Sequence, residues 1–369
     1  MRAWFLLATL FLLLAACGGR SENSSGQAAD APPLMSSEML AALKADDPVA
    51  LRELLDTGES PGAVDKANRW AVIRWAARHE GGKCLKLLLD RGVDPNILDE
   101  DGVAPIAVAA GSSSENNVRA LLEAGADPSL HGTDSHTALG MAAAYGNVET
   151  SRLLMEHGAS PVEPSYKHMT PLHMVVGGIE EPTVEILELY LKHVPPDATV
   201  DVDDGKGDTP LFHALYWSNE NAANRLIEAG ANPAVLPKDS ILLLAPLGTL
   251  NDGELLRAVL AGGFRLDTQD FKGHTMVHFA ASNAAVSALR TLVELGADIH
   301  SKSKEGNTPL HLAAMGDRDA DDRKPEFIEC VKLLLNAGAD KTVENEDGRT
   351  PQGVCLWPEV HVMLEPGSE

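Results

Sequence analysis

A short pattern returns along this chain at intervals close to 33 residues, and this repetition constrains the fold more than any other feature. The clearest copy is the run TPLHLAA at 308–314. Weaker copies start at Ala71, Ala104, Thr137, Thr170, Thr209, Ser240, Thr275 and Thr350. Glycines stand 21 residues after five of the starts, at Gly92, Gly125, Gly158, Gly230 and Gly296. Two landmarks that share one period predict a solenoid, in which each unit packs only against its neighbours.

The residues of the pattern suit a pair of short helices. Thr308 can cap the first helix by accepting a hydrogen bond from an amide of its first turn. Pro309 follows at the first helical position, where its missing N–H costs nothing. Leu310 and the small alanines at 313–314 point one face inward and allow close helix approach. Gly338 stands just past the second helix, where a positive φ ends it.

These motifs resemble the ankyrin-repeat family, and the resemblance covers about 330 of the 369 residues. It implies an all-α solenoid of about ten helix-loop-helix units with hairpin-like loops between them, spanning 35–365 here. The earliest unit is degenerate and is expected to open at Ser37. The family's histidine at the fourth pattern position hydrogen-bonds within and between loops, which implies structural roles for His173, His278 and His311.

The N-terminus has the features of a bacterial export signal. An apolar run at 3–14 follows Arg2, and it is too short to span a bilayer but suits a signal peptide over 1–16. The run ends in LAAC at 14–17, which resembles a lipobox and implies lipidation of Cys17. Residues 17–34 then form a flexible tether, and Gly18 in place of aspartate implies the outer membrane, facing the periplasm. An ordinary cleaved signal with a chance cysteine is the alternative.

The charge balance is strongly acidic, with a formal net charge of −24. Nucleic acids and anionic lipid surfaces are therefore poor partners, and contact with a membrane is expected only through the lipid anchor. Many of the acidic residues lie in the loops between repeats, for example at 99–101 and 201–208. These acids either face a basic protein partner or make local turn hydrogen bonds, and the two interpretations are compatible.

No motif in the chain predicts catalysis, a metal ion or a cofactor. His274 and His278 have metal-like spacing, but His274 precedes the helix cap and is not expected to share its face. The run DVDDG at 201–205 departs from a calcium loop, because glycine comes fifth and Phe212 falls twelfth. The GKG run at 205–207 lacks the spacing of a phosphate loop. We therefore expect a binding protein rather than an enzyme.

Aromatic residues mark the predicted binding surface. In ankyrin proteins the variable, outward-facing positions lie four, three and one before the pattern start, and seven and eight after it. Six of the eight Tyr and Trp residues beyond the signal peptide fall there. Large aromatic side chains are enriched among binding hot spots. We predict anchors at Tyr145, Tyr166, Tyr216 and Trp217, with Met169 and Phe271 nearby and a polar rim of Lys167, Lys206, Asp208 and Lys272. Trp70 and Trp357 are the members that more simply cover core edges.

Taken together, these features predict a lipid-anchored envelope protein that binds a protein partner through its concave face. An immunity-type inhibitor of a toxic effector enzyme and a scaffold for an envelope enzyme are two concrete versions. An enzyme with a composite loop site is the less favoured class.

Three local expectations remain. The apolar run at 241–245 is expected to be deeply packed, and the excess residues at 317–325 to form a loop between two helices. Cys330 and Cys355 are close enough in the repeat order to pair, but burial as small apolar residues is favoured.

Overall fold

The computed structural model describes residues 32–67, 69–112, 114–132, 136–164, 168–176, 182–317 and 321–365. Every regular element within these ranges is a helix, and the extended backbone there is limited to isolated bridges at Leu34–Val64 and Val64–Ala71. Cys17, Tyr166 and Lys167 lie outside the described residues, as do the predicted signal peptide and most of the tether. In the described part, no helix is long and apolar enough to cross a membrane. The chain divides into two compact units between Ser160 and Pro161.

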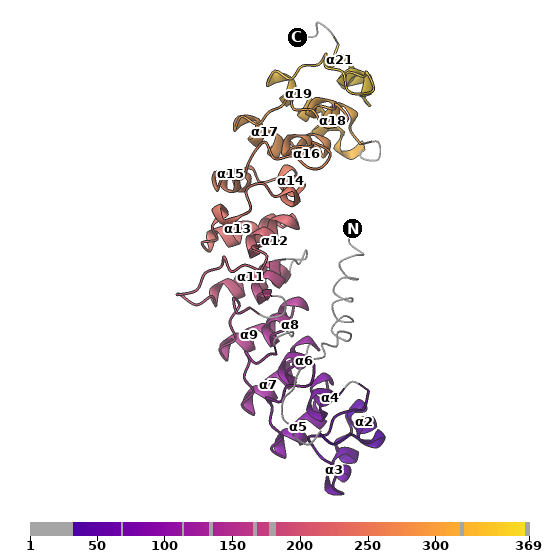
Figure 1. Ribbon diagram of the computed structural model, residues 1–369, viewed down its shortest axis with the longest axis vertical. Helices are drawn as coiled ribbons and strands as arrows, with labels where there is room; N and C mark the ends of the chain where they lie inside the picture. The colour runs from indigo at the N-terminus through magenta and orange to yellow at the C-terminus, as the bar shows by residue number, and fades with distance from the viewer. Residues whose placement is uncertain are drawn as a thin grey trace, which may run out of the picture. The chain divides into compact units, whose positions relative to one another are not determined.

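The described part of unit 1 contains four helix pairs. They are α2 (Ser37–Lys44) with α3 (Pro48–Asp56), α4 (Val72–Arg78) with α5 (Lys83–Asp90), α6 (Pro105–Gly111) with α7 (Glu115–Glu123), and α8 (Ala138–Ala144) with α9 (Val148–Glu156). The first helices α4, α6 and α8 stack in one row and the second helices α5, α7 and α9 in another (Figure 1). The expected opening at Ser37 is confirmed, and the hydroxyl of Ser36 caps α2 by accepting from the amide of Met39.

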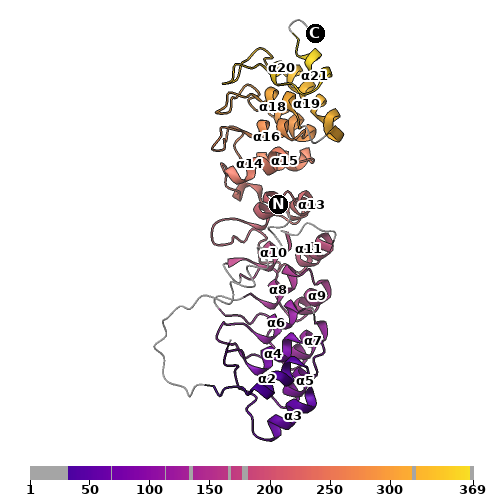
Figure 2. The ribbon, with the colours of Figure 1, turned by 90° about the vertical axis from the view of Figure 1, so that its right-hand side faces the viewer.

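The described part of unit 2 contains six helix pairs and the short 3₁₀ turns η2 and η3. They are α10 (Pro171–Val176) with α11 (Pro182–Lys192), α12 (Pro210–Tyr216) with α13 (Glu220–Glu228), η2 (Pro233–Val235), α14 (Ile241–Gly248) with α15 (Gly253–Ala261), α16 (Met276–Ser282) with α17 (Val286–Glu294), α18 (Pro309–Met315), η3 (Asp321–Arg323) with α19 (Lys324–Asn336), and α20 (Pro351–Val354) with α21 (Pro358–Met363). The loops between repeats project on the side of the first helices (Figure 2). This side of unit 2 is therefore built from loop tips and first helices together.

Burial follows the pattern that the repeat predicts. In α18, Leu310, Ala313 and Ala314 are fully buried, while the intervening Leu312 is half-buried. The first helices from α4 to α18 bury such a stripe against their neighbours in the stack, so the core runs along the repeats instead of gathering in one centre. Gly338 ends α19 with a φ of 92°, as expected for a residue that must adopt the left-handed conformation. The ankyrin-type architecture predicted from the sequence is confirmed.

The start of one repeat differs from the prediction by two residues. Ile241 and Leu242, expected to be deeply packed, are 52% and 53% exposed, and burial begins only at Leu243. Leu243, Leu244, Leu247 and Gly248 reproduce the buried stripe of the other first helices. The equivalent start is therefore Leu242, which lies 33 residues after Thr209 and 33 before Thr275. The first two residues of α14 therefore extend the helix beyond the core, which explains the exposed apolar pair.

The C-terminal repeats also show where irregular spacing is absorbed. The long step before Thr350 is taken up between α18 and α19, partly by η3, and Lys324 already belongs to α19. The excess segment is thus shorter than the predicted 317–325 loop. Trp357 is only 6% exposed and packs on Phe327, with ring centroids 5.3 Å apart. Trp357 covers the core edge. Although it stands seven residues after a pattern start, where outward-facing residues are expected, its side chain points inward.

Candidate protein-binding surface

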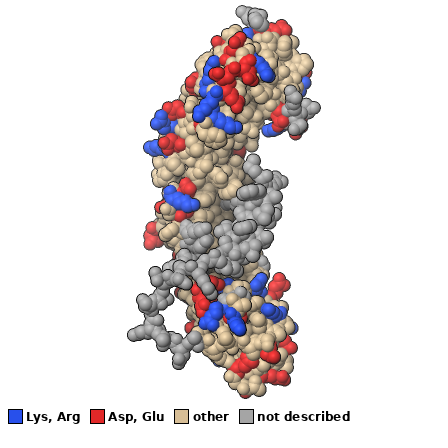
Figure 3. Space-filling view, turned by 45° about the vertical axis from the view of Figure 1, so that its right-hand side comes forward, with Lys and Arg blue, Asp and Glu red and all other residues tan. Residues whose placement is uncertain are grey.

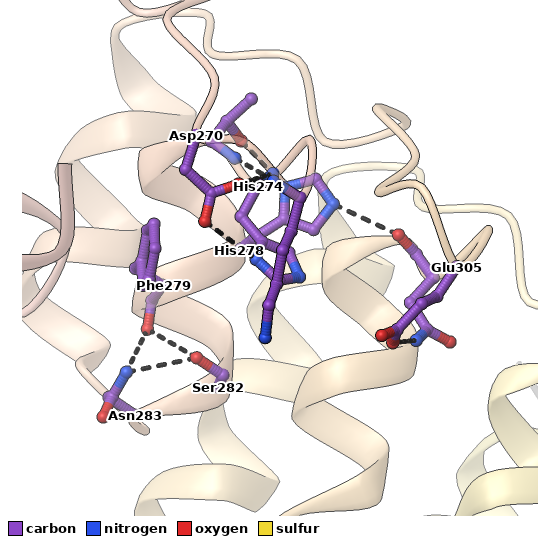
Figure 4. A network of polar contacts seen from close by, with 10 residues as sticks. Asp270, His274, His278, Phe279, Ser282, Asn283 and Glu305 are labelled. Carbon is purple, nitrogen blue, oxygen red and sulfur yellow. Dashed lines mark hydrogen bonds and ion pairs between the residues drawn. The ribbon is translucent and has the colours of Figure 1, made fainter. Parts of the chain in front are cut away.

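Three pattern histidines join each helix cap to the next repeat. In α16, Nδ1 of His278 accepts hydrogen bonds from the Thr275 amide (3.1 Å) and hydroxyl (2.9 Å), while Nε2 lies 3.2 Å from the Asn307 carbonyl oxygen. A carbonyl oxygen can only accept, so Nε2 carries the proton and Nδ1 does not. Figure 4 shows His278 within this polar network. His173 and His311 repeat the arrangement with the carbonyl oxygens of Asp208 and Arg349.

This arrangement requires neutral imidazoles. Burial lowers the pKa of His278 to about 4, and burial together with the neighbouring His213 lowers the pKa of His173 to about 4. Burial also lowers the pKa of His311. The hydrogen bond from Nε2 to the carbonyl oxygen of the next repeat raises the pKa of each histidine, but burial is the larger effect. The structural role predicted for these histidines is confirmed, and they connect repeats rather than forming a reactive site.

The strongest aromatic cluster lies at the end of α12. Tyr216 is 38% exposed and stacks on Phe212 with nearly parallel rings, whose centroids are 6.3 Å apart. Trp217 is half-buried and meets Tyr216 edge-on at 4.9 Å, and its amide donates to the His213 carbonyl oxygen. Phe212 holds the pair against the buried side of the helix, because it is itself buried. The anchors predicted at Tyr216 and Trp217 therefore reach the surface in a preformed arrangement.

Exposed apolar side chains also occur on the following repeats of unit 2. Ile241 and Leu242 extend from the first turn of α14, and Val235 in η2 is 46% exposed. Phe271, in the loop before α16, is 74% exposed, as its predicted groove position requires. We call Tyr216, Trp217, Val235, Ile241, Leu242 and Phe271 the apolar strip. Sequence reasoning missed Ile241 and Leu242, although counting 33 residues from Thr209 would have placed Leu242 before the buried stripe.

The other predicted surface residues are distributed between the two units. Tyr145 belongs to unit 1, where it caps α8 and is exposed, and burial of part of its ring raises the pKa of its hydroxyl. In unit 2, Met169 is half-buried before α10. Lys206 and Lys272 are exposed at loop tips, and Asp208 is half-buried. Trp70, the remaining tryptophan at a predicted groove position, lies in unit 1 with the Arg74 guanidinium 3.9 Å from its ring centroid.

Most of the loop acids make local turn bonds. Asp203 accepts from the Gly205 amide, and Asp204 accepts from the amides of Lys206 and Asp208. Asp201 instead accepts from the Asn232 amide, 31 residues further along the chain. Burial alone would raise the pKa of Asp204, but these amide hydrogen bonds hold it below its ordinary value. On the face in Figure 3, Lys and Arg side chains lie beside Asp and Glu side chains. The turn interpretation of Asp203 and Asp204 is confirmed, and it does not depend on a basic partner.

The cysteines of the described residues form no disulfide. Cys84 and Cys330 are buried free thiols, and Cys355 is a half-buried one that donates to the Trp357 carbonyl oxygen at 3.1 Å. Burial raises the pKa of Cys84 and of Cys330 to about 12. These thiols pack as small apolar side chains, as the sequence analysis favours.

Comparison with known proteins agrees with the observed repeat geometry. The chain matches the family described as "Ankyrin repeats (3 copies)" over residues 39–132 and 247–345, which together make up slightly more than half of its length. The chain belongs to the ankyrin-repeat family. Ankyrin repeats indicate protein–protein interaction, and nothing in the comparisons indicates catalysis.

Curated relatives share the repeats but not the whole protein. The B-cell lymphoma 3 protein homolog of Mus musculus is 27% identical over 209 residues, covering 54% of this chain and 44% of that protein. The SH3 and multiple ankyrin repeat domains protein 2 of Homo sapiens is 29% identical over 153 residues, covering 41% of this chain and 8% of that protein. The target of rapamycin complex 2 subunit AVO2 of Saccharomyces cerevisiae is 33% identical over 87 residues, covering 23% and 18%. The chain thus matches each of these relatives over less than half of that relative's length.

Proposed function

We propose that this ankyrin-repeat protein binds a protein partner through the apolar strip of unit 2. The observation that carries the proposal is the early start of α14, whose first two residues, Ile241 and Leu242, are each more than half exposed. Buried packing does not need these two side chains, because the core stripe of the helix begins after them. A branched apolar pair held in solvent by a rigid helix is a common feature of interaction surfaces.

The flanking aromatic residues give the strip the character of a hot spot. Tyr216 and Trp217 bury part of their area against each other before any partner arrives, so ordering them on binding costs little entropy. Phe271 stands two repeats further along on a loop tip. Lys206, Asp208 and Lys272 supply polar groups around the strip. A partner surface with apolar side chains at its centre and polar groups at its edge would complement this side of unit 2.

We further propose that the chain acts at a bacterial cell envelope, lipidated on Cys17 and facing the periplasm. This step rests on the LAAC run at 14–17 and on the apolar segment before it. Within that compartment, an immunity-type inhibitor would occlude the active site of a toxic enzyme, whereas a scaffold would leave its partner's activity intact. The activity of the captured partner with and without the chain separates the two versions.

Crosslinked co-purification from envelopes tests the binding surface. The full chain is compared with Leu242→Ser and Trp217→Ala, each carrying the same affinity tag. Because Leu242 is exposed, its replacement should change the free energy of unfolding by no more than about 0.5 kcal/mol. The yield of the crosslinked partner should fall at least severalfold in both variants. Val49→Ser, which changes an exposed apolar residue on α3 in unit 1, is the matched control.

Two results would contradict the proposal. If Leu242→Ser and Trp217→Ala recover the partner as well as the wild type does, the apolar strip is not the binding surface. If Val49→Ser loses the partner equally, the loss is not specific to unit 2. A Cys17→Ser form tests the anchor separately: it should shift the chain from the membrane fraction to the soluble fraction without weakening capture of the purified partner.

A further inference from the structure

Three side chains with metal-binding atoms converge beside the loop that precedes α12. One carboxylate oxygen from each of Asp204 and Asp208 and one ring nitrogen of His213 all lie within 4.8 Å of one another. Asp204 is only 6% exposed, and Oδ2 of this residue lies 3.6 Å from Nε2 of His213. Asp208 is half-buried, which leaves one side of the cluster open to solvent.

His213 departs from the repeat pattern at this place. It stands four residues after the start at Thr209, and the equivalent positions of the other repeats hold apolar residues. These are Trp75, Val108, Met141, Met174, Pro246, Phe279, Leu312 and Val354. An imidazole is therefore not needed for helix packing at this position. His213 also differs from the pattern histidines, because its ring makes no hydrogen bond with Thr209, the threonine that caps its helix.

The Nε2 atom of His213 is buried and has no hydrogen-bond partner among the described residues. A nearby pair shows the satisfied arrangement: His274 Nδ1 lies 3.3 Å from Asp270 Oδ2, and the two are hydrogen-bonded (Figure 4). At Asp204 the corresponding separation of 3.6 Å is too long for a good hydrogen bond. A buried polar atom without a partner is costly, so its retention needs a reason.

The loop holds the Asp204 carboxylate in place independently of His213. Oδ1 of Asp204 accepts from the Lys206 and Asp208 amides, which leaves Oδ2 directed at the histidine. The carbonyl oxygen of Asp208 accepts from the Asp204 amide at 3.0 Å and from His173 Nε2 at 3.1 Å. On the other side, the ring of His168 would lie 2.8 Å from any Cβ at Gly205, so the loop has little room to move there.

We propose that Asp204, Asp208 and His213 bind a divalent transition-metal ion of the zinc class. Zinc bonds imidazole nitrogen and carboxylate oxygen at about 2.0–2.2 Å, and ligand atoms around a tetrahedral ion are then about 3.4 Å apart. The 3.6 Å between Asp204 Oδ2 and His213 Nε2 is close to that spacing. The third ligand atom, a carboxylate oxygen of Asp208, lies within 4.8 Å of the other two. The set is unrelated to the calcium-loop pattern at 201–205, because the Asp201 carboxylate accepts from the Asn232 amide and the Asp203 carboxylate accepts from the Gly205 amide.

The ligand set also selects among ions. Imidazole suits Zn²⁺, Co²⁺ and Ni²⁺, whereas Mg²⁺ prefers oxygen ligands and keeps its water. We expect one saturable Zn²⁺ site per chain when the purified chain, freed of metal by a chelator, is titrated in a calorimeter. Co²⁺ should bind at the same site and give a visible absorption band. Mg²⁺ should give no comparable heat at the same concentration.

Two substitutions and one control decide the assignment. His213→Leu places at this position the residue that α18 carries there, and Asp208→Asn changes a half-buried loop residue, so both chains should fold with unchanged circular dichroism. Each should weaken Zn²⁺ binding at least tenfold and abolish the Co²⁺ band. His274→Leu removes a histidine from the satisfied Asp270 pair and should leave binding unchanged.

The proposal is overturned if the wild type shows no saturable Zn²⁺ binding, since Asp204 and His213 would then be a simple ion pair. It is also overturned if the folded His213→Leu chain binds Zn²⁺ as tightly as the wild type does, because other histidines would then hold the ion. Loss of binding in His274→Leu alone would place the site at the Asp270 loop instead, and would likewise refute it.

Discussion

The neutral state of His278 predicts how acid destabilises unit 2. The imidazole is almost fully buried, and burial lowers its pKa to about 4, whereas an unfolded histidine has a pKa near 6.5. The unfolded chain therefore binds a proton that the folded chain refuses between these two values. The stabilising contribution is complete above pH 6.5 and is lost as the pH falls from 6.5 toward 4.

The expected loss can be worked from the two pKa values. At pH 5, about 1.5 pH units below the pKa of the unfolded histidine, the unfolded side chain is protonated. The folded side chain, with a pKa of about 4, is still mostly neutral. At about 1.36 kcal/mol per unit, the free energy of unfolding should be about 2 kcal/mol lower at pH 5.0 than at pH 7.5 through this residue alone. His173, whose pKa is also lowered to about 4, should add a similar amount, so a single substitution should remove only half of the combined effect.

The assay compares the wild type with His278→Gln. Glutamine keeps a donor for the Asn307 carbonyl oxygen but does not titrate. The substitution therefore separates the effect of protonation on stability from the effect of losing the hydrogen bond. Urea unfolding is followed by circular dichroism at pH 7.5 and pH 5.0 for both chains. The drop in the free energy of unfolding between the two pH values should be about 2 kcal/mol smaller in His278→Gln than in the wild type.

All other titrating groups are common to both chains, so the difference between the two drops reports His278. Equal drops in the wild type and in His278→Gln would refute the reasoning, because they would mean that the folded protein accepts the proton at the same pH as the unfolded chain. A larger drop in the variant would refute it as well.

Two further predictions concern packing at buried positions. Gly316→Ala should destabilise the last repeats by about 1–3 kcal/mol, because a Cβ there would overlap the ring of Trp357 at a backbone φ of 58°; a melting temperature equal to that of the wild type would contradict this packing. Cys84 and Cys330 should resist alkylation in the folded chain, since burial raises the pKa of both thiols to about 12, while the half-buried Cys355 should react faster. Mass-spectrometric mapping of labelled peptides checks this order, and equal labelling of the three sites would show that the helices open more readily than the structure implies.

Much of the fold follows from the sequence because repeat packing is local. Thr308 and His311 lie three residues apart, and their capping bonds form within one helix turn, so the motif alone predicts both the helix start and the histidine's role. The histidine's second bond, to Arg349, reaches only into the next repeat, which the 33-residue period already places beside it. The exposure of Tyr216 and Phe271 follows from the same register.

Other features depend on how elements meet in space. Trp357 has a groove position by count, but an irregular last repeat turns its ring onto Phe327 and into the space beside Gly316. Leu242 belongs to an unbroken apolar run, which predicts that it is buried. In the structure, however, α14 stacks on α16 in such a way that burial starts at Leu243.

By itself, the sequence determined the helix pairs, their order and the bonds between successive caps, because each depends on residues one turn or one repeat apart. Only the tertiary structure decided that Trp357 packs on the core and that polar atoms from a loop and a helix meet beside α12. The cluster of Asp204, Asp208 and His213 is the clearest case. A loop and a helix face bring its three atoms together, and no spacing along the chain predicts the direction in which those side chains point.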